Sequence, residues 1–453
     1  MTQRMHQYDA RTVDLVFDYM RERLQYDPVP LDHPGDGERL GQALEGLLNA
    51  HGNDPADVLK LYDHELSRAV ISADSPRYLS FIPCAPTKAA LLFDMVVSCA
   101  SLQGISWLEA AGAIAAENQV LRLIADRAGL PDTAGGCFVS GGSAANLSAL
   151  VVARDTARHR LGLGPGARMR IAVSDQTHSS VTNTLNIIGV EKLVVPTEGH
   201  RLTGAALRAA LQAEGSDIPV IGVVGTAGTT NAGIIDDLAG IAEVAREYDL
   251  WFHVDGAYGG AGLFAPSVRE RYNGIEHADS FVVDPHKWLF APFDCAALIY
   301  RRPWLAKGVH TQDASYLDVL HTDDDEWNPT DYAYHLTRRA RGLPLWFSLA
   351  VHGTDAYTEA VETGLTLARD TAELIRSEYP DLELVLDPVL SSVVYRRRGW
   401  SAEDYYAWSK RLLADQTGFV TPTGWEGEVV ARFAFLHPGT TMDMVREILD
   451  TML

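Results

Sequence analysis

The chain has 453 residues, of which 47% are hydrophobic and 22% are charged. It is long enough for two or three packed units and has the composition of a folded globular protein, not of a disordered or fibrous one. The 60 acidic side chains outnumber the 38 Lys and Arg, and the formal charge of -22 repels nucleic-acid phosphate and anionic lipid, so we expect neither a nucleic-acid nor a membrane partner.

The N-terminal residues lack the basic stretch and apolar run of a signal peptide. Polar residues interrupt the most apolar segment, 89–116, which therefore predicts buried helices and not a membrane span. The four cysteines are far apart and form no C-x-x-C pair, so they give no zinc or disulfide pattern and fit a reducing compartment: Cys84, Cys99, Cys137 and Cys295. We expect a cytoplasmic protein.

Hydrophobic spacing predicts a helix over residues 12–25, and a proline-rich extended arm follows over 26–37. From about 130 to 300, short apolar runs alternate with longer amphipathic segments, which is typical of a parallel α/β sheet. The predicted strands are 170–173, 192–195, 219–224, 250–254, 280–283 and 296–300, and the clearest helices between them are 144–161 and 236–248.

An acidic stretch rich in helix breakers within residues 310–331 predicts a loop and a boundary. Beyond it, a long helix and a set of alternating strands around a second helix predict a smaller α+β unit: helices 345–378 and 403–414, and strands 382–386, 392–395 and 430–435. We therefore divide the chain into an N-terminal helical arm (1–75), a large domain (76–330) and a small C-terminal domain (331–453).

The segment Ser140-Gly141-Gly142-Ser143-Ala144-Ala145-Asn146 follows an apolar run and opens a predicted helix. Its small residues leave backbone N–H groups and the Ser143 hydroxyl free to bind an anion at a helix N-terminus. A glycine turn with a serine N-cap explains the same pattern equally well. The pattern of a nucleotide P-loop is absent.

Two further motifs place polar side chains beside buried strands. Lys287, in Asp284-Pro285-His286-Lys287-Trp288, lies in apolar surroundings that favour the neutral amine needed for a Schiff base, although a snorkelling lysine is the simpler interpretation. Asp255, in His253-Val254-Asp255-Gly256-Ala257-Tyr258, ends a predicted strand, where open α/β sheets bind ligands; a helix N-cap is its structural alternative.

The fourth motif is Asp175-Gln176-Thr177-His178-Ser179-Ser180, directly after the predicted strand 170–173. The His178 imidazole could stack on a planar ring there, or be an ordinary surface residue. The anion-binding turn, the histidine, the acid and the lysine all follow successive strands of one predicted sheet. Chance rarely produces such an arrangement, which indicates one functional site.

Together with Ser75-Pro76-Arg77-Tyr78, Phe81-Ile82-Pro83 and the run from Arg338 to Trp346, these motifs resemble the pyridoxal-phosphate-dependent group II amino-acid decarboxylases, whose best known member is aromatic L-amino-acid decarboxylase. The Pro285-His286-Lys287-Trp288 element is the most specific. The resemblance implies the fold of type I pyridoxal-phosphate (PLP)-dependent transferases: a large domain with a mostly parallel, seven-stranded sheet, which is the PLP-binding domain, a smaller C-terminal α+β domain and an N-terminal helical arm. It also implies PLP as cofactor and a homodimer with the active site at the interface.

The same resemblance implies roles for single residues. Lys287 is similar to the lysine that forms the Schiff base with PLP, and Asp255 to the carboxylate that keeps the pyridine nitrogen protonated. The other cofactor-binding positions that it implies are His178 and Ala257 on the two faces of the ring, Gly142 and Ser143 at the phosphate, and Thr226 and His286. Asp284 departs from the family, whose members often carry asparagine there, and an ionised aspartate cannot donate a hydrogen bond to phosphate.

In the family, a tyrosine from a loop of the partner subunit supplies the proton that replaces the carboxylate. Tyr332 and Tyr334 both precede the Arg338 motif, and the order Thr330-Asp331-Tyr332 favours Tyr332 over Tyr334. The segment Phe81-Ile82-Pro83 matches the lining of the substrate pocket, with Ile82 where the aromatic enzymes tend to have phenylalanine.

The sequence therefore predicts decarboxylation of an L-amino acid to its amine and CO2, with an aromatic substrate expected: tyrosine, DOPA, tryptophan or phenylalanine. The alternatives are decarboxylation of a non-aromatic amino acid, another PLP-dependent lyase or aldehyde synthase of the same fold, and a catalytically silent scaffold protein. The acidic residues 323–326 are interpreted as a solvated loop, so no metal site is expected.

Overall fold

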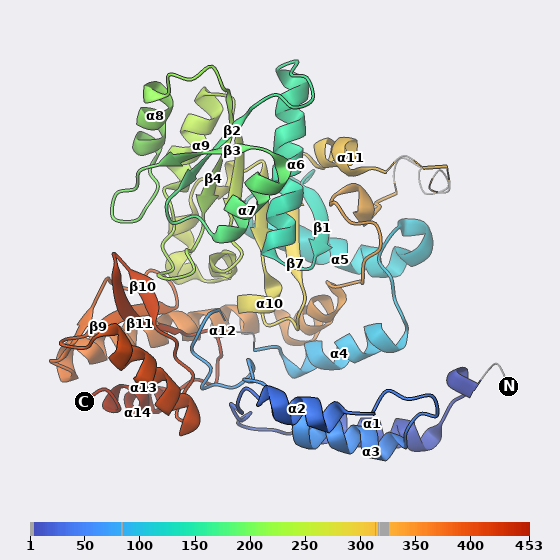
Figure 1. The fold of residues 1–453 in the computed structure, drawn as a ribbon. Helices are drawn as coiled ribbons and strands as arrows, with labels where there is room; N and C mark the ends of the chain where they lie inside the picture. Colours follow the sequence, from blue (N-terminus) through green and yellow to red (C-terminus); the bar gives the residue numbers. More distant parts are fainter. Residues whose placement is uncertain (1–3, 83–84, 313, 316, 318–325) are drawn as a thin grey trace.

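The computed structural model describes residues 4–82, 85–312, 314–315, 317 and 326–453, and its centre is a seven-stranded mixed sheet (Figure 1). The strand order is β1-β7-β6-β5-β4-β2-β3, and only β7 runs antiparallel to its neighbours. The strands are β1 (Gly135–Val139), β2 (Arg170–Ser174), β3 (Glu191–Val195), β4 (Val220–Thr226), β5 (Trp251–Asp255), β6 (Ser280–Val283) and β7 (Ala296–Tyr300). The predicted mostly parallel sheet is confirmed.

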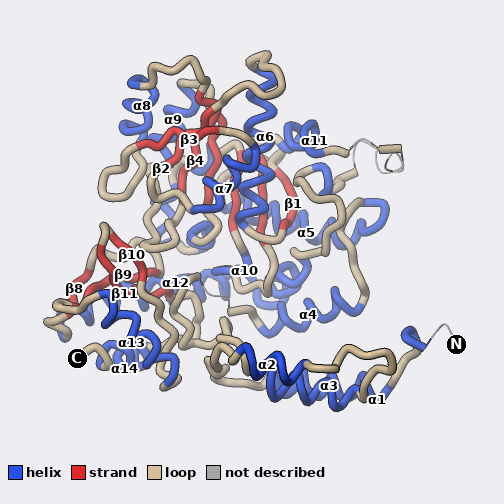
Figure 2. The backbone as a smooth tube through the Cα atoms, in the orientation of Figure 1, coloured by secondary structure: helices blue, strands red, loops and turns tan. Residues whose placement is uncertain are grey.

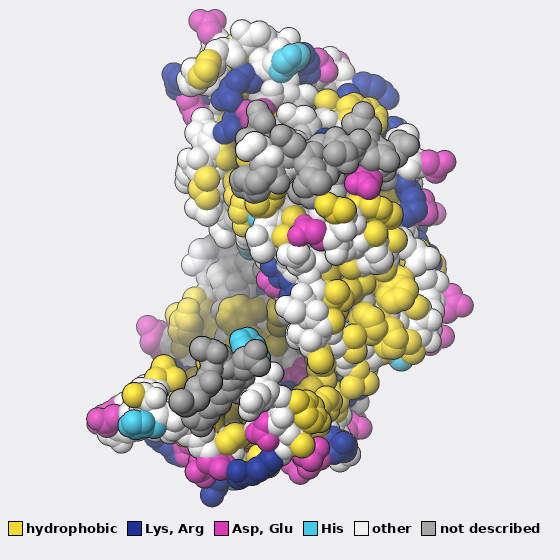
Figure 3. Space-filling model, turned by 90° about the vertical axis from the view of Figure 1, so that its right-hand side faces the viewer, with side chains coloured by type: hydrophobic (Ala, Val, Ile, Leu, Met, Phe, Trp, Pro, Cys, Tyr) yellow, Lys and Arg dark blue, Asp and Glu magenta, His cyan; other side chains and the backbone are white. Residues whose placement is uncertain are grey.

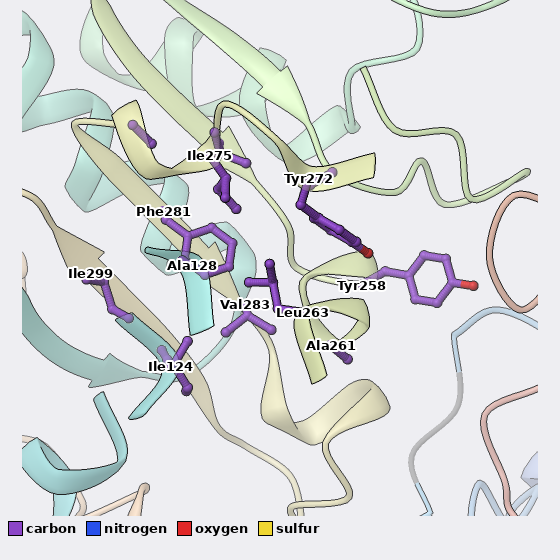
Figure 4. Close-up of a cluster of buried hydrophobic side chains, with 14 of the residues drawn as sticks. Ile124, Ala128, Tyr258, Ala261, Leu263, Tyr272, Ile275, Phe281, Val283 and Ile299 are labelled. Atoms are coloured by element: carbon purple, nitrogen blue, oxygen red, sulfur yellow. The ribbon is translucent and has the colours of Figure 1, made fainter. Parts of the chain in front are cut away.

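Helices cover both faces of this sheet, because side chains of a buried strand point alternately to opposite faces. One face packs on the apolar sides of α5 (Trp107–Ala128), α8 (Gly204–Ala213) and α9 (Leu238–Glu247). Figure 4 shows part of this core, where Ile124 of α5 lies among side chains of the strands. The other face packs on α6 (Gly142–Arg160), α7 (Ser179–Ile188) and α11 (Pro303–His310).

The C-terminal part forms a four-stranded antiparallel sheet in the order β10-β11-β9-β8, seen at the lower left of Figure 2. The strands are β8 (Leu382–Leu384), β9 (Ser392–Arg397), β10 (Thr423–Trp425) and β11 (Glu428–Ala434). The helices α13 (Ala402–Ala414) and α14 (Met442–Asp450) bury Trp408 and Val445 in the same core. The expected small α+β unit is therefore present.

Helix α12 (Leu343–Glu378) joins the two cores. A non-helical residue, Gly353, divides it. Leu345 and Tyr357 pack in the core of the large sheet, whereas Leu374 and Ile375 pack against the small sheet. Side chains of the predicted 331–453 segment thus contribute to the core of the large domain, and the exact domain boundaries stay a prediction.

The N-terminal arm forms a separate layer along one side of the molecule (Figure 1). None of the residues of its three helices is buried: α1 (Ala10–Leu24), α2 (Gly37–Leu44) and α3 (Pro55–Leu61). Helix α4 (Lys88–Cys99) follows, and it lines a cavity together with the segment after α1. In the described part of the chain, no helix combines the length and the apolar character that crossing a membrane requires.

Candidate active site

A cavity of about 210 Å³ lies beyond the C-terminal ends of the parallel strands. Every cofactor-binding residue expected from the sequence lines it: Gly142, Ser143, His178, Thr226, Asp255, Ala257, His286 and Lys287. These residues come from five different loops, and the strand order β6-β5-β4-β2 places most of those loops side by side. The remaining lining residues include Asn146, Gln176, Ser180, Thr229 and Asp284.

Asp255 is the last residue of β5 and is held at both carboxylate oxygens. Oδ2 accepts a hydrogen bond from Nδ2 of Asn146 at 2.9 Å, and Oδ1 accepts one from the backbone N–H of Ala257 at 3.1 Å. The residue is 5% exposed, so the carboxylate is a buried anion in a fixed orientation. Such a group is suited to stabilise a cation inside the cavity.

His178 is the N-cap of α7, and its Nδ1 faces Ser180. The Ser180 hydroxyl lies 2.8 Å and the Ser180 backbone nitrogen 3.2 Å from Nδ1. Because a backbone N–H can only donate, Nδ1 is an acceptor and the ring proton of the neutral imidazole is on Nε2. The opposite nitrogen of an exposed ring is thus presented as a donor.

Lys287 and the glycine turn meet at one carboxylate. Asp284 is 3% exposed, and its Oδ2 lies 2.9 Å from Nζ of Lys287 and accepts the Gly142 N–H at 3.1 Å. Nε2 of His286 is 3.6 Å from the same oxygen, and its Nδ1 accepts the Cys295 N–H, while burial lowers the pKa of His286. Asp284 is therefore the counter-ion of Lys287, a role that the sequence did not predict.

Two buried polar atoms at the cavity have no hydrogen-bond partner among the described residues: Oγ1 of Thr226 and Oδ1 of Asp284. Buried polar atoms are normally paired, so unpaired atoms at a cavity indicate a bound group. The 19-residue helix α6 begins at the same space, with Gly142 and Ser143 in its first turn, so the positive end of its dipole points to the cavity. The Thr226 hydroxyl and the helix N-terminus suit an anionic group, whereas the buried Asp255 carboxylate suits a cationic one.

The described part of the substrate segment, Phe81 and Ile82, and the two loop tyrosines lie outside this cavity. Phe81 is 59% exposed, Ile82 packs against the large core, and Pro83 is outside the described residues. Tyr332 is 4% exposed and stacks on Trp327 at 4.2 Å, and burial raises the pKa of its phenol. Phe81, Ile82 and both tyrosines thus contribute no side chain to the lining of the cavity in their own chain.

The two tyrosines that the sequence offers as proton donor differ in exposure, and the preference for Tyr332 stays a prediction. The Tyr332 side chain belongs to the core on the α6 face, where it could be reached only by unpacking, whereas Tyr334 is 53% exposed. Residues 328–333 are all buried, and Tyr334 is the first exposed position after them. The choice between the two tyrosines stays a prediction.

Residues 39–398 match the pyridoxal-dependent decarboxylase conserved domain, and the chain belongs to this family. It is therefore a PLP-dependent amino-acid decarboxylase, as the resemblance implied. The chain is 29% identical over 458 residues to the aromatic-L-amino-acid decarboxylase of Bacillus atrophaeus, covering 98% of this chain and 94% of that protein.

A second relative has a different substrate in its name. The chain is 31% identical to the L-2,4-diaminobutyrate decarboxylase of Rhizobium meliloti, over 83% of this chain and 77% of that protein. Among solved structures, the Oryza sativa protein described as TDC with PLP and tryptamine superposes with a TM-score of 0.89 at 25% identity, covering 98% of this chain and 99% of that one. The type I fold and the PLP cofactor expected from the sequence are confirmed, whereas the substrate is left open.

Proposed function

We propose that the protein removes the α-carboxylate of an aromatic L-amino acid and releases the amine. The observation that carries this proposal is the single cavity in which Lys287, Asp255 and His178 meet. When bound, PLP supplies an electron sink for the electron pair that CO2 leaves behind. Relatives named aromatic-L-amino-acid and tryptophan decarboxylases support the aromatic class.

The chain's own residues divide the work of binding and orientation. Lys287 offers its Nζ to the cofactor aldehyde, and the buried Asp255 carboxylate keeps the pyridine nitrogen in its protonated, electron-withdrawing form. His178 and Ala257 would flank the cofactor ring, and Gly142, Ser143 and the α6 N-terminus would hold the phosphate. His286, Thr226 and Thr229 complete the polar wall.

Phe81 and Ile82 are proposed to line the substrate pocket, with Pro83, at the subunit interface. Arg432 of β11 is 5% exposed and donates hydrogen bonds to the carbonyl groups of Phe81 and of Thr230, a residue of the cavity wall. The small domain thereby ties the Phe81 segment to the active site. This contact supports a pocket wall beside the cavity.

We also propose a homodimer, because the helices of the N-terminal layer present apolar side chains that the described part of the chain leaves uncovered. These helices bury no residue, and Phe17 is 55% exposed. Leu92 and Val96 of α4 and Leu108 of α5 are about half exposed as well, and Figure 3 shows broad hydrophobic areas on one side of the molecule. A second copy of the chain would cover these side chains.

The cytoplasmic location is proposed on the cysteines. Cys99, Cys137 and Cys295 carry free thiols, and two of them are buried. Such thiols persist in a reducing compartment.

The decisive experiment is a screen of the purified, PLP-loaded protein with the common L-amino acids, DOPA and L-2,4-diaminobutyrate, measuring CO2, amine, aldehyde and peroxide. Equimolar CO2 and amine from an aromatic substrate is the expected result. Turnover of diaminobutyrate alone would establish the non-aromatic alternative, and aldehyde with peroxide would establish an aldehyde synthase. No turnover of any substrate would refute the proposal.

A further inference from the structure

The amide of Asn146 lies at the centre of a buried hydrogen-bond network behind the cavity. Asn146 is 1% exposed and stands one turn into α6, on the side that faces β5. Its Nδ2 donates to Oδ2 of Asp255 at 2.9 Å and to Oγ of Ser180 at 3.1 Å, and its Oδ1 lies 2.8 Å from Nε2 of His253. All hydrogens of this amide are therefore used.

The protonation of His253 follows from its neighbours. The indole Nε1–H of Trp251 donates to Oγ of Ser280 at 2.8 Å, and this hydroxyl in turn lies 2.8 Å from Nδ1 of His253. The Asn146 carbonyl can only accept, so Nε2 of His253 carries the proton and Nδ1 accepts from the Ser280 hydroxyl. His253 is completely buried, which lowers its pKa to about 4 and keeps the ring neutral.

The donor direction then continues to His178. Ser180 accepts the second N–H of Asn146 and gives its own hydroxyl proton to Nδ1 of His178. A reversed Asn146 amide would turn its carbonyl oxygen toward the Asp255 carboxylate and its N–H groups toward the N–H of His253. Both contacts would be repulsive in a buried site, so the network has one orientation.

We propose that His253 and Asn146 are positioning residues that couple the two polar groups at the cofactor ring. His253 fixes the orientation of the Asn146 amide. The amide then holds the Asp255 carboxylate and orients the Ser180 hydroxyl, which joins the Ser180 backbone N–H as a second and shorter donor to Nδ1 of His178 and so favours the proton on Nε2. This inference rests on the proposed roles of Asp255 and His178.

A matched pair of variants at position 253 tests the coupling. The amide nitrogen of Gln coincides with Nε2 of histidine, so His253→Gln keeps the donor to Asn146. The shorter side chain of His253→Asn reaches only the level of Nδ1 and loses it. Both substitutions introduce a neutral amide into the same site, and the comparison isolates the hydrogen bond to Oδ1 of Asn146.

The first measurement is the tautomer of His178 by ¹⁵N NMR of the histidine-labelled holoenzyme, with His178→Gln to assign the signal. We expect the Nε2–H form alone in the wild type and in His253→Gln, and a tautomer mixture in His253→Asn. The second is the PLP dissociation constant. His253→Asn should raise it about tenfold, the scale of a lost hydrogen bond to a charged group, and His253→Gln less than about threefold.

Equal values for the two variants in both measurements would overturn the proposal. If His253→Asn does not fold, Asn146→Ala must give the same tautomer mixture, because it removes both N–H donors while His253 remains. Asp255→Asn tests the proposed role of Asp255 separately from the coupling through His253 and Asn146. If it leaves PLP binding and turnover unchanged, the role of Asp255 fails, whereas the His178 tautomer still decides whether the coupling exists.

Discussion

Replacing Asp284 by asparagine should tighten PLP binding. Oδ2 of Asp284 accepts a hydrogen bond from the Gly142 N–H at 3.1 Å and pairs with Nζ of Lys287 at 2.9 Å. An anionic ligand would compete with Asp284 for these two donors. In Asp284→Asn, Oδ1 of the amide can keep both contacts. The amide NH2 group of the asparagine then takes the position of the unpaired Asp284 Oδ1 and offers an N–H donor at the cavity.

The size of the effect follows from the distances. A phosphate held by the N–H groups of this turn must come within about 3 Å of a backbone nitrogen, so its charge lies roughly 5 Å from the Asp284 carboxylate. At an effective dielectric constant of about 20, two unit charges at this separation repel by roughly 3 kcal/mol. Lys287 offsets part of this repulsion, so we expect the PLP dissociation constant to fall at least about tenfold.

The assay is fluorescence titration of the apoenzyme with PLP and, in parallel, with pyridoxal, which has no phosphate. Only the PLP affinity should rise in Asp284→Asn. Asp294→Asn is the matched control, because Asp294 pairs with Arg341 and does not line the cavity. Weaker PLP binding, or an equal change for pyridoxal, would refute the repulsion argument and assign Asp284 a role in holding the ring or Lys287.

Three further outcomes are expected. Tyr334 is 53% exposed and Tyr332 only 4%, so Tyr334→Phe should divert product from amine toward aldehyde and peroxide, whereas Tyr332→Phe should mainly alter stability. Analysis of the products of both variants checks this expectation. Diversion by Tyr332→Phe alone would contradict it. Glu117→Gln should lower the free energy of unfolding, measured by urea denaturation, by about 3–5 kcal/mol. Arg338 is 2% exposed and lies 2.8 Å from both carboxylate oxygens of Glu117, so it would stay charged in the variant without a charged partner. A loss below about 1 kcal/mol would contradict this argument. Burial lowers the pKa of His253 from 6.5 to about 4. Between these pH values the unfolded chain binds a proton at His253 and the folded chain does not, so the free energy of unfolding decreases as the pH falls. His253→Gln should flatten this pH dependence in urea denaturation, and an unchanged slope in the variant would contradict the argument.

Sequence reasoning succeeded where a local pattern has one structural solution. Six apolar runs between amphipathic segments predicted six of the seven strands of the large sheet. Alternation predicted β8, β9 and β11 of the small sheet but missed the three-residue strand β10. The strand β1 was recognised only as the apolar run before the glycine turn. The predicted helix 236–248 begins at Leu238, because Asp237 is its N-cap and Asp236 instead accepts the backbone N–H groups of Thr226 and Leu202.

Site residues were found where chemistry requires an unusual side chain at a strand end, as for Lys287 and Asp255. Residues that act through other residues gave no such signal. Asn146 and His253 both stood within the quoted motifs, yet 107 positions separate them and no local pattern relates them. Tyr332 was chosen from a short motif, which carries no information on its 4% exposure, and its role stays a prediction.

The strand order explains why these partners escape a reading along the chain. A parallel sheet guarantees that strand ends share an edge, but the order β6-β5-β4-β2 decides which loops become neighbours. Within β5, alternation directs Phe252 and Val254 to the core on the α5 side and leaves His253 and Asp255 on the α6 side, where Asn146 lies. The Asp255 carboxylate is thus oriented by a helix that begins after β1, a strand three positions away in the sheet. The orientation of the anion at the ring therefore depends on how α6 crosses the sheet, a property of the whole large domain and not of the motif that contains Asp255.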